Sequence, residues 1–294
     1  MLKVQRLPIN WVVISFVGVW IAAIALQTHS MQLLQNYGNF TLLGIVGAIF
    51  ANSTGAGGGV VFIPAFNHLN FSVEQALATS FAIQCMGMTS GALAWRRFYQ
   101  QTHKEQVSEG SWGLIANISA VCAIACGIGL WCTYLFSWQS PTSLEQLFGW
   151  FSLILGSAIL ASSLLKTSRA QRFQLQTFDY LSLVLVGFFG GIITAWLSVG
   201  VGEILAIYLI MRKFDVMLAI ASAVVVSALT VWIGVAEHAL IRAEVVWSVV
   251  LFAGPGAIVG AMLARKLATR LPVRQLKAFF ALWVLLMGAV SLAQ

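Results

Sequence analysis

The stretch "NSTGAGGGVVFIP", from Asn52 to Pro64, places four glycines within the five residues Gly55 to Gly59. Apolar runs flank it on both sides, "FTLLGIVGAIFA" before it and "VVFIPAF" after it. It lacks the Lys-Ser/Thr pair that follows a P-loop and the third glycine of a GxGxxG fingerprint. The stretch therefore breaks an apolar segment without forming a nucleotide-binding loop.

The composition explains the apolar surroundings. The 294 residues are 60% hydrophobic and only 9% charged, whereas a globular domain has about 25% charged residues. Charge-poor stretches long enough to cross a bilayer recur at 9–26, 111–143, 175–197 and 245–264. The chain is predicted to be an all-α polytopic membrane protein. Its net charge of +7 is typical of the cytoplasmic flanks of such helices, so the expected partner is the bilayer and not nucleic acid.

Cysteine and histidine patterns indicate no metal site and no cofactor. The four cysteines lie in apolar segments without a CxxC pair, and the four histidines form no HxxxH pattern. Residues 1–27 could form a signal peptide, since Lys3 and Arg6 precede an apolar run, but the length of that run favours a retained first span.

An internal repeat divides the rest of the chain. At a constant offset of 143 residues, Gly44 meets Gly187, Gly57 meets Gly200, and "FSVEQALATS" meets "FDVMLAIASA" without a gap. We expect an N-terminal span and outer loop over residues 1–39, a first repeat over 40–165 and a second repeat over 179–293.

Each repeat opens with a segment split by glycines, which could be one broken spanning helix or a re-entrant hairpin. The halves of the first segment, 40–51 and 60–67, would be about 18 and 12 Å long as helices, so each reaches only part of the way through about 30 Å of hydrocarbon. With the N-terminus inside and both segments re-entrant, all of the 16 Lys and Arg residues except Arg242 lie inside. If both segments span, the basic residues divide almost evenly, which the positive-inside rule disfavours. The inside set is Lys3, Arg6, Arg96, Arg97, Lys104, Lys166, Arg169, Arg172, Arg212, Lys213, Arg265, Lys266, Arg270, Arg274 and Lys277.

Each repeat then consists of one re-entrant hairpin and three transmembrane helices, and the odd number of crossings inverts the second repeat. Two glycine tips are expected to meet near the midplane, where free N–H groups at helix starts favour a small anion. Hydroxyls and amides beside the tips add donors. The candidate substrate-binding residues are Asn52, Ser53, Thr54, Gly57, Gly58, Gly59, Thr79, Ser80, Ser198, Gly200, Gly202 and Ser222.

Three further residues have open roles. Glu203 follows Gly202 where the first repeat has Val60, and a membrane-embedded acid is a functional candidate. It could carry a coupling proton, or it could face a wet vestibule or pair with a polar neighbour. Gln84 and Cys85 lie one helical turn beyond Ser80 and could line the site, although packing is the simpler role for Cys85.

The pattern "GIVGAIFANSTGAGGGVVFIPAF", followed by "ALATS", resembles the TauE/SafE sulfite-exporter family, and the likeness extends over residues 40–293. The second repeat departs from it, because Gly-Val-Gly-Glu replaces Gly-Gly-Gly and no proline follows. The resemblance implies a secondary transporter, usually an exporter, of sulfite or a small organosulfonate in the bacterial inner membrane. A channel or a permease for another small anion, such as thiosulfate, sulfate or a carboxylate, remains an alternative. An enzyme is not expected, since no catalytic dyad lies at membrane depth. The oligomeric state is not predicted.

Overall fold

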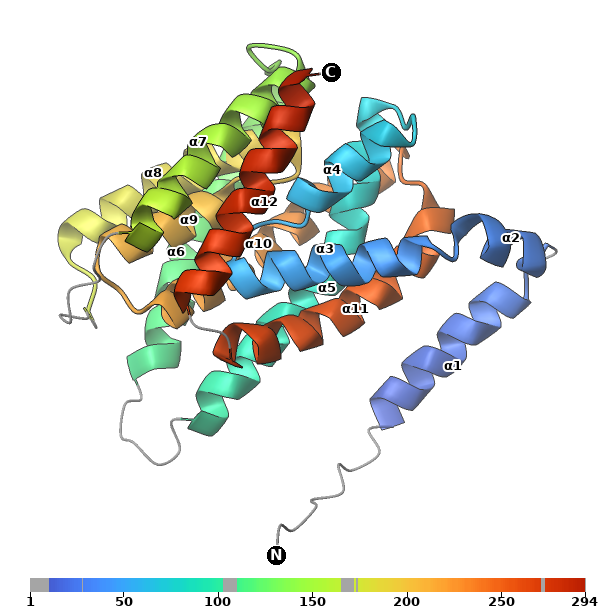
Figure 1. Cartoon of the computed structure of the whole chain (residues 1–294), viewed down its shortest axis with the longest axis horizontal. Helices are drawn as coiled ribbons and strands as arrows, with labels where there is room; N and C mark the ends of the chain where they lie inside the picture. The colour runs from blue at the N-terminus through green and yellow to red at the C-terminus, as the bar shows by residue number, and fades with distance from the viewer. Residues whose placement is uncertain are drawn as a thin grey trace, which may run out of the picture. The chain divides into compact units, whose positions relative to one another are not determined.

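A computed structural model describes residues 11–27, 29–102, 110–164, 172, 174–270 and 273–293. Within these residues the regular structure is helical, apart from one isolated bridge between Arg172 and Phe214. The chain separates into two compact units, residues 1–39 and residues 40–294. The first unit holds α1 (Trp11–Ala25) and α2 (Ser30–Tyr37). Figure 1 follows the chain from blue to red.

The described helices of the second unit fall into two series along the chain. The first series is α3 (Phe40–Thr54), α4 (Gly59–His68), α5 (Val73–Thr102), α6 (Gly110–Leu135) and α7 (Leu144–Leu164). The second is α8 (Thr177–Leu197), α9 (Val201–Met211), α10 (Val216–Ala236) with the π-helix η1 (Glu237–Ile241), α11 (Trp247–Arg270) and α12 (Val273–Ala293). In the described part of the chain, four helices are long and apolar enough to cross a membrane, or up to five if a bent pair counts as one span. The all-helical membrane class is confirmed at this level.

The first glycine break is a turn at which the chain reverses. The ring of Phe40, at the start of α3, lies 6.2 Å from the ring of Phe66, near the end of α4. Between these ends, Gly47 of α3 packs directly against the ring of Phe62. The start of α3 and the end of α4 therefore lie close together.

The second glycine break reverses the chain in the same way. Val201 of α9 packs against Gly190 of α8. At the other end of the pair, the Arg212 guanidinium donates to Asp179 Oδ1 at 2.7 Å, and the Tyr208 hydroxyl donates to the same oxygen at 2.8 Å. The two helices are unequal, however: α8 has 21 residues, about 31 Å at 1.5 Å per residue, which is long enough to span a bilayer by itself. Only its N-terminal part is paired with the returning α9.

The two hairpins open toward opposite ends of the α5–α10 pair. Phe81 of α5 stacks on His238, and Thr89, two turns further along α5, accepts a hydrogen bond from the Trp232 indole at 2.8 Å. The later residue of α5 thus contacts the earlier residue of the α10–η1 segment, so the two helices are antiparallel. The helices that follow the two glycine breaks, α5 and α10, thus run in opposite directions.

Close helix packing repeats between the two series. Helix α3 packs against α11, and the equivalent α8 packs against α6, while α7 packs against α12. Small residues make these contacts possible, since a side chain on any of these glycines would meet a backbone carbonyl of the facing helix. They are Gly44, Gly256 and Gly260 for α3–α11, and Gly129, Gly187 and Gly191 for α6–α8.

The described basic residues gather at one end of this unit. The Arg265 guanidinium lies over the Phe98 ring, which joins the ends of α11 and α5, and Arg96 lies over Trp112 at the start of α6. Arg242, the exception predicted from the sequence, pairs with Glu237 at the far end of α10. Lys3, Arg6, Lys104, Lys166 and Arg169 lie outside the described residues, as do the side chains of Arg274 and Lys277.

Candidate functional site

The two glycine breaks contact each other in a reciprocal way. A Cβ on Gly59 would run into the carbonyl of Ser198, and a Cβ on Gly202 would run into the carbonyl of Gly55. Gly59 and Gly202 occupy equivalent places in the two repeats, and so do Gly55 and Ser198. Gly55 has a φ of +84° and Gly200 a φ of +149°, conformations that glycine adopts without the steric cost of a Cβ. Glycine is thus required here both for backbone geometry and for close approach.

Glu203 lies between the two breaks and bonds to both of them. Its Oε1 accepts the N–H of Gly57 at 2.6 Å, and its Oε2 accepts the N–H of Gly200 at 2.8 Å. The side chain is 2% exposed. Gly57 and Gly200 are repeat equivalents, so one carboxylate bridges two symmetry-related donors. The side chain is thus buried between the tips and α10.

Gln84 of α5 holds the breaks together from one side. Its Oε1 accepts the N–H of Gly58 at 2.7 Å, and its Nε2 donates to Ser198 Oγ at 2.9 Å and to Ser80 Oγ at 3.0 Å. The Ser198 hydroxyl in turn donates to Ser80 Oγ at 2.9 Å. Ser80, Gln84 and Ser198 therefore form one buried network that reaches both tips.

Between these groups lies a pocket of about 10 Å³, which is room for at most one water molecule. The pocket lining includes Thr194, Ser227 and Thr230, none of which we predicted as site residues. Ser227 could have been found, because it is the repeat equivalent of Gln84. Thr194 accepts the N–H of Val201 at 3.1 Å, a contact that depends on how the second break folds back over α8. The site is closed in this conformation.

The other predicted residues direct most of their polar groups away from Glu203, although the Thr54 hydroxyl accepts the N–H of Ala56 in the first break at 3.3 Å. The hydroxyls of Ser53 and Thr54 donate to the Phe50 carbonyl within their own helix. The Asn52 amide donates to the Ala48 carbonyl, and the Thr79 hydroxyl accepts the N–H of Val246. The Cys85 thiol lies 3.5 Å from the Val231 carbonyl. Ser222 is fully buried, and its hydroxyl has no hydrogen-bond partner among the described residues.

A larger cavity of about 550 Å³ opens at the end of the unit that holds Arg242. Its lining includes Arg242, His238 and Tyr134, and it extends to Trp196, two residues before Ser198. The Trp196 indole donates to the carbonyl of Trp138, which lines the same cavity, at 2.9 Å. The lining carries both an acid, Glu74, and a base, Arg242.

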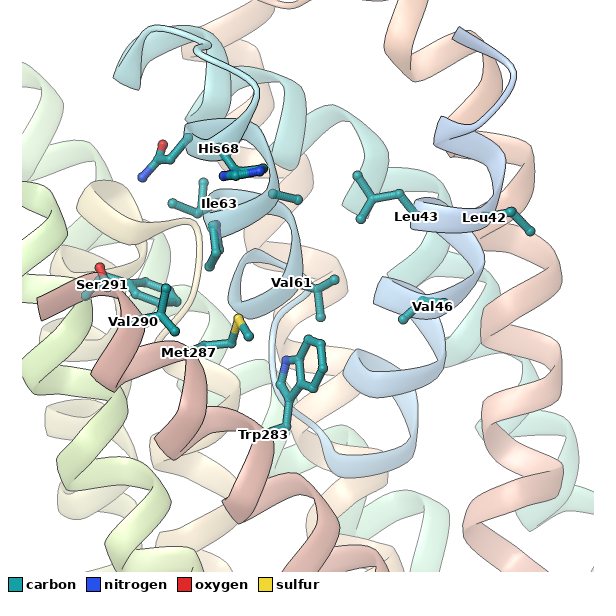
Figure 2. A pocket seen from close by; sticks show the side chains of 14 residues that line it. Leu42, Leu43, Val46, Val61, Ile63, His68, Trp283, Met287, Val290 and Ser291 are labelled. Atoms are coloured by element: carbon teal, nitrogen blue, oxygen red, sulfur yellow. The ribbon is translucent and has the colours of Figure 1, made fainter. Parts of the chain in front are cut away.

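A second large groove has a different chemistry. It measures about 470 Å³ and lies among α3, α4 and α12. Figure 2 shows Leu42 and His68 at one end of the α3–α4 hairpin and Val46 and Val61 nearer its turn, with Trp283 below them. Because the lining is mostly aliphatic and aromatic, this groove offers little to a charged solute.

Comparison with known protein families matches residues 40–291 to the family described as Sulfite exporter TauE/SafE. The chain belongs to this family. The match begins at Phe40, where the second compact unit also begins. No curated protein and no solved structure matches the chain. As a TauE/SafE member, the chain is a multi-pass membrane transporter and not an enzyme, and its family indicates sulfite or related sulfur anions as the class of solute.

Proposed function

We propose that this chain is a secondary transporter, operating as an exporter, of a small sulfur-containing anion such as sulfite or an organosulfonate. One observation carries the proposal: the N–H groups of Gly57 and Gly200, from two hairpins of opposite direction, converge on a single position, and that position holds a carboxylate. Backbone N–H groups at helix starts attract anions through unpaired donors and the helix dipole. A carboxylate and a sulfur oxyanion present similar oxygen acceptors to such donors.

We place the two series of helices as inverted repeats in the bacterial inner membrane, with the glycine breaks at the midplane and the N-terminus in the cytoplasm. The opposite approach of the two hairpins supports the inversion. The gathering of described basic residues such as Arg96 and Arg265 at one end, with Arg242 at the other, supports the orientation. The cavity beside Arg242 is then the outer approach to the site.

The closed site favours a carrier over a channel. A pore needs a continuous wet path, whereas the space between the tips holds at most one water. In a carrier, the substrate reaches the tips from one side at a time, as the two repeats move against each other. Trp196 lines the Arg242 cavity two residues before the second break, so we propose that it takes part in closing the outer side.

A counterflow screen tests this function. The purified protein is reconstituted into liposomes preloaded with sulfite, thiosulfate, sulfoacetate, taurine or sulfate, and uptake of the labelled form of the same anion is followed. We expect saturable counterflow with sulfite or a sulfonate and none with protein-free liposomes. Linear flux without counterflow would indicate a channel, and the absence of flux with every anion in the panel would overturn the proposed function.

A further inference from the structure

Glu203 is the only acid of the chain that touches the backbone of both glycine breaks within the described residues. We infer that Glu203 is a tethered occupant of the substrate's own anion position, so that its ionised carboxylate and the transported anion exclude each other. Binding of the anion then requires a proton on Glu203, and one proton accompanies each anion in the same direction. This inference rests on the proposed function and deepens it.

Four backbone donors at the two breaks are occupied by the chain itself. Gly57 and Gly200 donate to Glu203, Gly58 donates to Gln84, and Val201 donates to Thr194. Among these acceptors only Glu203 is an anion, and only Glu203 takes donors from both tips. An anion that is to occupy the same two N–H groups must displace this carboxylate, because the remaining space holds no more than one water.

A purely structural role for the carboxylate is disfavoured by the repeat. The first repeat has Val60 at the equivalent place, so the hairpin itself can form without an acid there. The tips are also joined without Glu203, through the Gly59 and Ser198 contact and through the hydrogen bonds of Gln84. An acid buried at this depth is costly, which indicates that it is retained for transport.

Among the described residues, the lining of the pocket that holds the carboxylate includes no Lys, Arg or His. On the elements packed around α9, Asp179 of α8 is paired with Arg212 at the open end of the hairpin, and α10 has no charged residue. Two thiols lie on neighbouring helices: Cys85 of α5 contacts the Val231 carbonyl, and Cys126 of α6 contacts the Thr230 hydroxyl. On α7, the charged residue is Glu145, at the second position of the helix. The charged form of Glu203 is therefore stabilised by the N–H groups of Gly57 and Gly200. The substrate anion needs the same two donors.

The proton follows a balanced path. Water on the open side supplies one proton to the Glu203 carboxylate, which becomes a neutral acid. The neutral acid turns toward the hydroxyls of Ser227 and Thr230, which line the same pocket, and leaves the Gly57 and Gly200 N–H groups to the incoming anion. When the anion leaves on the other side, the acid releases its proton there and the carboxylate returns to the tips.

The test compares wild type with Glu203→Val, which reproduces the Val60 of the first repeat and empties the anion position. Dissociation constants for sulfite are measured by titration on detergent-purified protein at several values between about pH 5 and pH 8. Because sulfite itself titrates, the ratio of the wild-type constant to the variant constant isolates the contribution of Glu203. The ratio is expected to rise with pH and to approach about tenfold per pH unit once Glu203 is mainly ionised.

Two further variants guard against an uninformative result. Glu203→Gln keeps the size of the side chain and one acceptor but removes the charge, so it should bind sulfite without the Glu203 pH dependence even if the valine variant does not fold. Glu244→Gln removes a carboxylate from the loop before α11 and should keep the wild-type ratio. Each protein must elute as a single species before it is titrated.

The outcomes separate the two proposals. A ratio that rises with pH for both Glu203 variants supports the tethered occupant. Sulfite binding with the same constant and the same pH dependence in wild type and both variants overturns it, while leaving the proposed function intact. If no anion of the counterflow panel binds or is transported by wild type, the proposed function fails, and this inference fails with it.

Discussion

The two glycine breaks have nearly the same backbone but opposite chemistry. The first, at residues 55–58, provides donors through the N–H groups of Gly57 and Gly58. The second, at residues 198–200, provides one equivalent donor, Gly200, but also two acceptors, the Ser198 side chain and the nearby Glu203. The comparison teaches that the two repeats supply equivalent donors, the N–H groups of Gly57 and Gly200. The space between them is filled by Glu203, which stands where the first repeat has Val60.

The largest loss of transport is expected from a larger side chain where the two glycine breaks contact each other. Gly202→Val places a side chain against the Gly55 carbonyl and the Ser227 hydroxyl, so the tips must separate. We expect loss of nearly all counterflow and a lower melting temperature, with a cost of about 1–3 kcal/mol for the forced overpacking. Gly113→Ala is the matched control, since nothing lies within 4 Å of a Cβ there. Wild-type flux in Gly202→Val would remove the tips from the proposed site.

The next effect tests whether the first break depends on α5. Gln84→Leu leaves the Gly58 N–H and the Ser198 side chain without this partner, and each unsatisfied buried group costs about 1–3 kcal/mol. Anion counterflow is expected to fall by at least about tenfold, since about 1.4 kcal/mol corresponds to a factor of ten. Flux and melting temperature are compared with those of Gln100→Leu, an exposed position on the same helix. Unchanged flux in Gln84→Leu would mean that the network is not needed.

A smaller effect, on the melting temperature and its dependence on salt, should distinguish the ends of the two helix pairs that lie away from the glycine breaks. Hairpin α8–α9 is closed by the Asp179–Arg212 ion pair, whereas hairpin α3–α4 is closed by the rings of Phe40 and Phe66. Asp179→Asn should lower the melting temperature by removing the charge from the hydrogen bond with the partly exposed Arg212, and Phe66→Leu should lower it through lost packing. Added salt should reduce the difference between wild type and Asp179→Asn but not the effect of Phe66→Leu. Equal salt responses would contradict the assignment of the ion pair.

The smallest effect is expected at Cys85. Its thiol is directed at the Val231 carbonyl and not at the tips, so Cys85→Ala should change the apparent KM for sulfite by less than about twofold, within the few tenths of a kcal/mol expected for a position with no contact to the anion. Ser80→Ala on the same helix, which removes a partner of Gln84 and Ser198, should raise it more. A tenfold rise in Cys85→Ala would restore this residue as part of the site.

Much of the site follows from the repeat, and the rest does not. The offset of 143 residues paired Gly57 with Gly200, which both donate to Glu203, and Gly59 with Gly202, which each contact the other break, at Ser198 and Gly55. The hydroxyls were harder to place, because a serine or threonine in a helix can donate to its own backbone. Ser53 and Thr54 do so, and Thr79 bonds to Val246. Spacing gives the depth of such a residue but not the direction of its hydroxyl.

The sequence by itself determined the membrane class, the repeat and the positions of both backbone breaks. These follow from local quantities: hydropathy over about 20 residues, the conformational freedom of glycine and the count of basic residues on each side. Only the tertiary structure decided that Glu203 lies between Gly57 and Gly200, and that Thr194, Ser227 and Thr230 complete the pocket. The contact between Glu203 and Gly57 joins residues more than a hundred positions apart, and it depends on how the two halves of the chain pack against each other.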